Sequence, residues 1–314
     1  MMEFFGQYPI IKWILLGFGI LYVLDKYGIF SPIDNLINRI GKYKFTMSSH
    51  LNNPKLKELI FYFNNKQFNN VEQSLKGMNE SYRTFALKSL GQYGEPVISD
   101  QWMVRESNNT LPKIIKSYQL IHKAWEIRGR GSIDTVSNQK QVAFKKYLGE
   151  ARDLLVTIDY DSTSFYPNCV SSLLKIYKSL DVDRQSVHEL FTNAARIYSD
   201  NIELHFNFFS FISPKWGGSE DEYNSYLNQL NQQKPFIQDL ILAQHYFDLE
   251  YFHDYKDEDK KMENFMETIK NNSYELDELF QYELYLIVYW LSSNLGLKEL
   301  EKYFENVLKP YWED

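Results

Sequence analysis

The sequence predicts an all-α protein, an irregular array of antiparallel helix pairs that follows an N-terminal transmembrane helix. Three observations lead to this fold class. Apolar side chains recur at spacings of three and four along most of the chain. Gly and Pro are sparse, 14 and 9 in 314 residues, and fall mainly between these periodic segments. No segment shows the convincing alternation of apolar and polar residues that predicts a strand.

An apolar segment near the N-terminus predicts a membrane anchor over residues 1–30. Residues 10–24 read IIKWILLGFGILYVL, and their one charge, Lys12, lies near an end where its amine could reach the lipid head groups. The run is shorter than the roughly 20 residues of a spanning helix, so a buried helix of the soluble domain is the alternative. The residues expected in the bilayer are Trp13, Ile14, Leu15, Leu16, Phe18, Ile20, Leu21 and Leu24.

Positive charges around this segment predict its orientation. Lys26, Arg39, Lys42 and Lys44 follow it, whereas Lys12 is the only Lys or Arg before residue 26. Because positively charged flanks tend to stay in the cytoplasm, we expect the body of the chain there. A juxtamembrane connector over residues 31–52 would join the anchor to the body.

The helical body is expected to run from residue 53 to residue 314. Asn53 followed by Pro54 has the pattern of a helix start, with a capping side chain and a proline in the first turn. Residues 111–128 carry a continuous apolar stripe that ends at Gly129. The segment between these two helices, residues 94–109, reads as a long irregular connection.

Two apolar segments indicate the centre of this body. Ile202–Ile212, with the sequence IELHFNFFSFI, is ambiguous by pattern, but its length and its neighbours favour a buried helix. Leu284–Leu291 is apolar on all sides, which predicts a central buried helix.

The helix pairs suggest a repeat architecture. The similar segments Ile158–Asp161 and Ile197–Asp200 each end a helix and lie 39 positions apart. Helical solenoids have periods in this range, and tetratricopeptide repeats run near 34 residues, so the array is expected to be tetratricopeptide-like. Regular repeats and an irregular array are both compatible with the pattern. Stacked helix pairs form a curved surface that suits binding of another protein chain.

Composition narrows the possible ligands. Residues 201–314 hold 22 acidic and 9 basic side chains, and residues 1–200 hold 19 and 25. The acidic half argues against nucleic-acid binding, which needs a basic track, and the basic half would suit an anionic membrane face. A single cysteine, Cys169, excludes an internal disulfide framework and a thiolate metal cluster. We expect no cofactor and no metal.

Catalytic motifs are missing, and one cation stands out. The sequence contains no glycine-rich phosphate loop, no paired histidines of a zinc protease and no G-x-S-x-G, so no catalytic residue is predicted. Cys169 reads as a small buried residue. Arg128 falls on the same stripe as Trp125, so its guanidinium faces the apolar side of its helix. Such a cation must be paired or in contact with a ligand.

The stretch ISPKWGGSEDEY, residues 212–223, reads as a structural turn between helices. Pro214 cannot continue the preceding helix, and Gly217 and Gly218 permit a sharp turn with positive φ. Ser219 and Glu222 have the spacing of a capping box for the next helix. Lys215 has no part in this capping and could face a partner.

Two motifs together carry a family resemblance. AWEIRGRG, residues 124–131, and PKWGGSEDE, residues 214–222, resemble the motifs of a bacterial domain-of-unknown-function family of α-helical, tetratricopeptide-like proteins. The resemblance covers roughly residues 55–235, so the N-terminal segment and the acidic C-terminal part lie outside it. It implies a fold class and no activity, and it implies that the tryptophans of the two motifs could pack near one another. A bacterial origin would place the anchor in the inner membrane as a single pass.

Two classes of function remain open at this point. The first is a membrane-anchored, non-enzymatic scaffold that binds a partner protein, as an adaptor, an assembly factor or an immunity protein that neutralises a toxin. The second is an enzyme or a small-ligand-binding protein. The residues expected to contact a partner or ligand in either case are Trp125, Arg128, Lys215 and Trp216.

Overall fold

The body of the chain is all-helical, as the sequence predicts. The structure, a computed structural model, describes residues 49–129, 135–159, 163–180, 182–251, 259–272 and 277–309. Within these ranges it contains α-helices and one 3-10 turn and no strand. The predicted anchor and most of the connector lie outside the described residues. Within the described ranges no helix combines the length and apolar content that a bilayer span requires.

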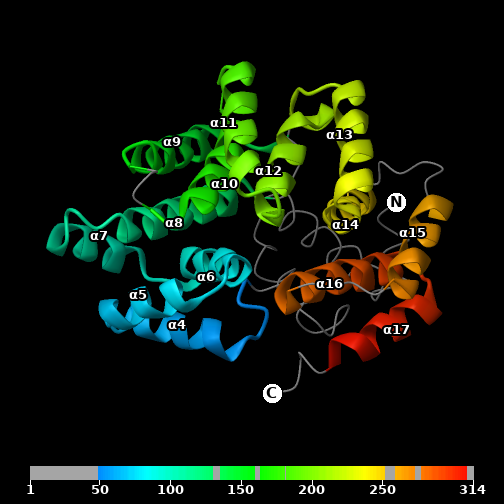
Figure 1. The fold of residues 1–314 in the computed structure, drawn as a ribbon, viewed down its shortest axis with the longest axis horizontal. Helices are drawn as coiled ribbons and strands as arrows, with labels where there is room; N and C mark the ends of the chain where they lie inside the picture. Colours follow the sequence, from blue (N-terminus) through cyan, green and yellow to red (C-terminus); the bar gives the residue numbers. More distant parts are fainter. Residues whose placement is uncertain are drawn as a thin grey trace, which may run out of the picture. The chain divides into compact units, whose positions relative to one another are not determined.

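The helices follow one another closely along the chain. In order they are α4 (Pro54–Asn64), α5 (Phe68–Gly77), α6 (Glu80–Tyr93), α7 (Pro96–Arg105), α8 (Leu111–Arg128), α9 (Asn138–Leu155), α10 (Tyr166–Tyr177), α11 (Arg184–Ile197), α12 (Ile202–Ile212), η3 (Pro214–Trp216), α13 (Glu220–Gln233), α14 (Pro235–Tyr251), α15 (Asp259–Asn271), α16 (Glu278–Asn294) and α17 (Lys298–Leu308). Figure 1 shows this order in colour from blue to red.

The predicted helix ends are confirmed where the sequence signals were strong. The Asn53 side chain accepts hydrogen bonds from the amides of Lys55 and Leu56, and Pro54 lies at the first helical position of α4. Helix α8 ends at Arg128, and the next residue, Gly129, has a φ of 71°. Glycine adopts a positive φ of this kind without a Cβ penalty.

The predicted irregular connection over residues 94–109 is wrong, because α7 occupies most of it. Pro96 lies at its first helical position, and its buried residues are Ile98, Ser99 and Trp102. The Trp102 ring is fully buried and stacks on Phe68 with ring centroids 4.4 Å apart. Apolar side chains also lie on the exposed side of this short helix, so its sequence does not show a clean helical period.

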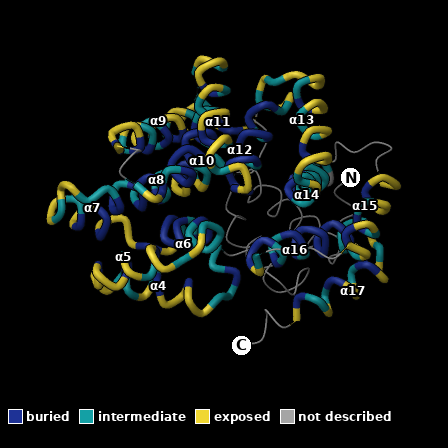
Figure 2. The backbone as a smooth tube through the Cα atoms, in the orientation of Figure 1, coloured by how far each residue is buried: buried dark blue, intermediate teal, exposed yellow. Residues whose placement is uncertain are grey.

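The even-numbered helices from α6 to α16 contact one another in a closed order. Contacts join α6 to α8, α8 to α10, α10 to α12, α12 to α14 and α14 to α16, and α16 returns to contact α6. We call these six helices the inner ring. Helices α7, α9, α11, α13 and α17 each contact a member of this ring. Much of α10, α12 and α16 is buried in Figure 2, whereas exposed residues are frequent along α4, α5 and α13.

Both apolar segments that the sequence placed at the centre belong to the inner ring. Ile202–Ile212 forms α12, with nine of its eleven residues buried. In α16, the residues of Leu284–Leu291 are buried apart from half-buried Tyr285. The helix and burial assignments for these segments are therefore confirmed.

Aromatic packing and capping side chains join α16 to α6. The rings of Phe85 and Phe280 meet edge to face with centroids 4.9 Å apart, and both side chains are buried. At the N-terminal ends of the two helices, Asn79 Nδ2 donates to Asp277 Oδ2 over 3.0 Å. These residues are almost 200 positions apart, so this contact closes the ring between distant parts of the chain.

Candidate functional site

The structure brings the two tryptophan motifs together. Trp125, in the last turn of α8, and Trp216, in η3, meet edge to face with ring centroids 6.0 Å apart. The guanidinium of Arg128 lies 5.4 Å from the Trp125 ring and 6.0 Å from the Phe144 ring. Arg128 Nη1 also donates to the carbonyl of Gly129. Lys215 is exposed on η3.

A second lysine, which the sequence analysis did not select, lies against both tryptophans. Lys178 Nζ is 5.2 Å from the Trp125 ring centroid and 5.0 Å from the Trp216 ring centroid. It also donates to Ser210 Oγ over 2.8 Å. Each such cation–π contact contributes about 0.5–1 kcal/mol at partly exposed sites. Lys178, directly after α10, and Arg128, at the end of α8, thus both contact the Trp125 ring.

The turn over residues 212–222 agrees with the sequence in most details. Helix α12 ends at Ile212, Pro214 begins η3, and Gly217 has a φ of 84°. Gly218 differs, because its φ is not positive; a Cβ at this position would lie 1.7 Å from the carbonyl oxygen of Ile212. Gly218 is therefore required by close backbone approach and not by a left-handed conformation.

The predicted capping box is only half formed. Ser219 Oγ accepts from the Glu222 amide over 3.1 Å. The Glu222 carboxylate does not reach back to the cap. It contacts His188 Nε2 at 2.9 Å and Arg184 at 3.5 Å, because α11 offers it positively polarised partners. The reciprocal bond expected from the sequence is thus replaced by a contact between α11 and α13.

Alanine substitutions at the glycines should separate their roles. Gly218→Ala is expected to lower the free energy of unfolding by at least about 2 kcal/mol, because the Ile212 backbone must move. Gly217→Ala should cost about 1–2 kcal/mol for its left-handed conformation. Gly149→Ala, in α9 with open space around it, should stabilise by about 0.5–1 kcal/mol. Urea unfolding measures all three, and equal effects at Gly218 and Gly149 would contradict this assignment.

Trp125 also lines a cavity between helices of the inner ring. We call it the Lys175 cavity; its volume is about 210 Å³. Its lining residues come from α6, α8, α10 and α12, together with one residue before α4. They are Ser49, Lys88, Gln92, Tyr118, Ile121, His122, Trp125, Ser171, Ser172, Lys175, Glu203 and Asn207. Arg128, Lys215 and Trp216, the other predicted contact residues, are not among them.

An ion pair crosses this cavity wall. Lys88 Nζ lies 2.7 Å from Glu203 Oε2, and Asn207 Nδ2 donates to the other Glu203 oxygen over 3.2 Å. Asn207 Nδ2 also donates to Ser171 Oγ over 2.7 Å, so α6, α10 and α12 are joined through one polar network. Among the described residues, no hydrogen bond or ion pair engages the amine of Lys175.

Burial and neighbouring charges shift the pKa values of this cluster. Burial disfavours the charged form of Lys88, but the Glu203 and Glu283 carboxylates outweigh it and raise the pKa of Lys88 to about 12. Burial also opposes the charge of Glu203, yet Lys88 and Lys175 lower its pKa below the ordinary value. For Lys175, burial prevails and lowers the pKa. Lys88 and Glu203 are therefore a stable ion pair, and Lys175 is a cation without a comparable partner.

Glu283, on α16, is expected to make stability depend on pH. Burial raises the pKa of its carboxyl, and Glu203 adds to this effect against Lys88 and Lys175. The folded state therefore keeps the proton where the unfolded chain loses it, and stability falls as pH rises from about 4.5 through the folded pKa.

Glu283→Gln should remove this fall. Urea midpoints of the variant and the parent should diverge in favour of the variant between pH 4 and pH 8. Exposed Glu299→Gln, on α17, is the matched control. The same pH dependence in both variants would contradict the assignment.

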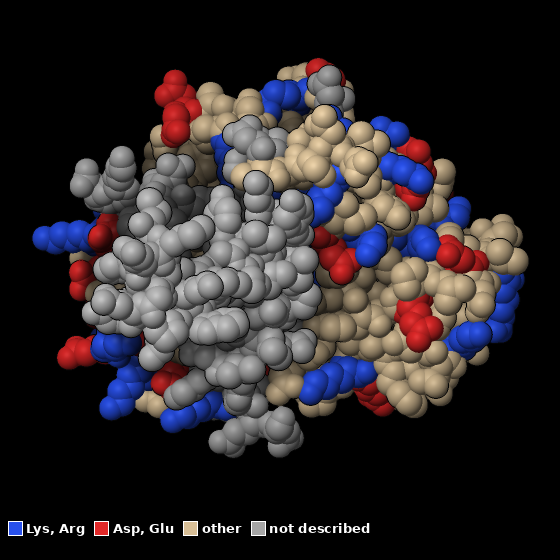
Figure 3. All heavy atoms as spheres, turned by 180° about the vertical axis from the view of Figure 1, so that it is seen from behind, with Lys and Arg blue, Asp and Glu red and all other residues tan. Residues whose placement is uncertain are grey.

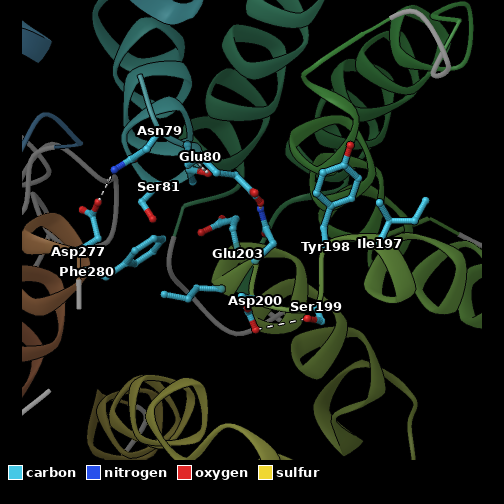
Figure 4. Close-up of a pocket in the computed structure, with 13 residues that line it drawn as sticks. Asn79, Glu80, Ser81, Ile197, Tyr198, Ser199, Asp200, Glu203, Asp277 and Phe280 are labelled. Carbon is cyan, nitrogen blue, oxygen red and sulfur yellow. Dashed lines mark hydrogen bonds between the residues drawn. The ribbon is translucent and has the colours of Figure 1, made fainter. Parts of the chain in front are cut away.

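A second cavity, of about 490 Å³, lies at the N-terminal ends of α6, α12 and α16. Figure 4 shows Glu80 and Glu203 near its centre and Asp277 beside Asn79 at one side. Glu203 lines both cavities. These acidic groups have structural partners. Asp277 caps α16 and accepts from Asn79, which caps α6, and Glu80 accepts from Asn201, which caps α12. Negative charge is favourable at helix N-termini, which accounts for Asp277 and Glu80. Asp200 pairs with Lys234, and Glu203 pairs with Lys88.

The lone cysteine is not among the residues that line the Lys175 cavity. Cys169, near the start of α10, is fully buried, and burial raises the pKa of its thiol to about 12. The expectation of a small buried residue is confirmed.

Comparisons with known proteins give no relative. No family model, curated protein or solved structure matches the chain. The resemblance carried by the AWEIRGRG and PKWGGSEDE motifs therefore stays a prediction.

Two charged residues give a sequence signal for the Lys175 cavity that apolar periodicity does not reveal. Lys175 and Glu203 are single charges within helices whose other residues are largely buried. A charge in such a helix must find a partner or face a cavity. The apolar pattern predicts that α12 is buried but does not indicate which groups surround the Glu203 carboxylate.

Proposed function

We propose that this protein binds a small polar molecule in the Lys175 cavity. The observation that carries the proposal is the Lys175 amine, which lines the cavity while, among the described residues, no hydrogen bond or ion pair engages it. Lys175 is partly buried, and a cation drawn partly out of water gains from a partner, which a bound molecule would supply. The role is that of a binding protein, and no catalytic step is assigned to it.

The size of the cavities favours a small molecule over a protein chain at the inner faces of the ring. Ligand pockets in proteins are typically about 300–1,000 Å³. The Lys175 cavity, of about 210 Å³, lies below this range, so it suits only a very small ligand and is far too small for a folded partner. The contact of α16 with α6 supports this choice, because it joins the first and last helices of the inner ring.

The motif tryptophans support the same proposal. Trp125 lines the cavity, and Trp216 and Lys178 pack against its ring. The second motif would then fix the orientation of Trp125. In this proposal the helix pairs form a tetratricopeptide-like array held at the cytoplasmic face of a bacterial inner membrane by residues 1–30.

Small molecules that remain bound during purification test the proposal. The full chain, purified under gentle conditions, is denatured, and the released molecules are measured by mass spectrometry. The parent should release close to one molecule per chain, and Ser172→Leu, which fills part of the cavity, should release much less. Ser74→Leu, on α5 and outside the cavity lining, is the control. Equal release from parent and Ser172→Leu, or no release above a blank, would contradict the proposal.

A second candidate is the partner-protein scaffold. It is favoured by apolar side chains that project from α7, where Val97 is 53% and Val104 is 86% exposed. Crosslinking in membranes should then yield a protein adduct that Val104→Asp reduces while the fold is retained. An adduct pattern unchanged by this substitution would argue against α7 as the contact surface.

A further inference from the structure

The charged side chains that line the Lys175 cavity are not balanced. Lys88 and Lys175 supply two positive charges, and Glu203 supplies one negative charge. The oxygens of Glu203 are already engaged by Lys88 and Asn207. The remaining cation at the wall is Lys175. On the surface seen in Figure 3, by contrast, basic and acidic side chains of the described residues are interspersed.

Two further residues that line the cavity each carry a hydrogen-bonding group without a protein partner. Trp125 Nε1 and Ser49 Oγ are buried, and within the described ranges neither has a hydrogen-bond partner. Both residues line the cavity. An indole N–H can only donate, as can a lysine ammonium. The missing partner of Trp125 and of Lys175 must therefore be an acceptor, whereas the Ser49 hydroxyl can donate or accept. Leaving a buried hydrogen-bonding group unpaired costs about 1–3 kcal/mol.

An acceptor beside one unbalanced cation is best supplied by an anion. We propose that the Lys175 cavity binds a small oxyanion, the carboxylate or phosphate group of a small molecule, with Lys175 as the charge partner and Trp125 Nε1 as a hydrogen-bond donor. This inference rests on the proposed function and adds the chemical class of the ligand. Lys88 serves the site indirectly, because its charge is taken up by Glu203.

Titration calorimetry of the full chain with simple ions tests the ligand class. The probes are sodium acetate, inorganic phosphate and tetramethylammonium chloride. We expect one or both anions to bind, and Lys175→Met to weaken that binding about tenfold or more, because a charge-assisted hydrogen bond is lost. Trp125→Phe keeps a ring against Trp216 and removes the donor, so its loss should be smaller, about three- to tenfold. Exposed Lys145→Met, on α9, is the control for a general loss of positive charge.

The outcomes separate this inference from the proposed function. Stronger binding of acetate assigns a carboxylate, and stronger binding of phosphate assigns a phosphate. Anion binding that Lys175→Met and Lys145→Met weaken equally would overturn the inference. Binding of tetramethylammonium alone would also overturn it, while a molecule released by the parent and lost in Ser172→Leu would leave the proposed function standing. If no ion binds and no molecule is released, both proposals fall.

Discussion

Glu203→Gln is expected to lower the free energy of unfolding by about 3–5 kcal/mol, the loss typical when one partner of a buried ion pair is removed. The Lys88 and Glu203 side chains are only 24% and 11% exposed, so water replaces little of the lost interaction. Lys175 would also lose its nearest source of negative potential. Because the pKa of Glu203 is lowered in the folded state, the effect should be present above about pH 4.5 and fade as pH falls. Urea unfolding at pH 7 and pH 4 measures both.

The control for this prediction replaces both members of the Lys88–Glu203 ion pair. Lys88→Met combined with Glu203→Leu should recover most of the loss, because apolar residues of similar size often replace a buried pair at little cost. Glu126→Gln, in an exposed pair with Lys123 at 2.8 Å, should cost less than about 1 kcal/mol. If Glu203→Gln costs no more than Glu126→Gln, the ion pair does not stabilise the cavity wall.

Phe280→Ala should lower the free energy of unfolding by about 3–5 kcal/mol, since it removes a buried aromatic ring from the core. Phe280 packs on Phe85, so the substitution acts on the contact that joins α16 to α6. Hydrogen exchange should show faster exchange in both α6 and α16. Urea unfolding gives the magnitude.

Phe61→Ala, on α4, is the matched control because its ring is 58% exposed. It should change the free energy of unfolding by less than about 1 kcal/mol and leave exchange in α16 unchanged. If Phe280→Ala speeds exchange in α16 alone, the contact between α6 and α16 does not close the inner ring.

Local features of the fold could be predicted from the sequence, because they depend on neighbouring residues. The cap at Asn53, the end of α8 at Gly129 and the turn at Gly217 each follow from backbone chemistry within a few positions. Helix α7 could not be read in the same way, because apolar residues on its exposed side hide the stripe that contains Trp102. The return of α16 to α6 depends on Phe85 and Phe280, whose separation in sequence leaves no periodic signal.

The candidate site, too, depends on contacts between residues that are distant in sequence. The two motifs identified Trp125 and Trp216, which do meet, and Trp125 alone of the four expected contact residues lines the Lys175 cavity. Lys88, Lys175 and Glu203 come from three helices and become one cluster only through tertiary packing. Their sequence signal is a charge within a largely buried helix, which predicts the need for a partner but not its identity.

A crystal structure of the full chain, purified from the cells that produce it naturally, tests the central claim most directly. The account predicts density for a small molecule in the Lys175 cavity, with an acceptor oxygen within hydrogen-bond distance of Lys175 Nζ and Trp125 Nε1. A cavity that holds only water at high resolution, or that is filled by a side chain of this protein, would contradict it.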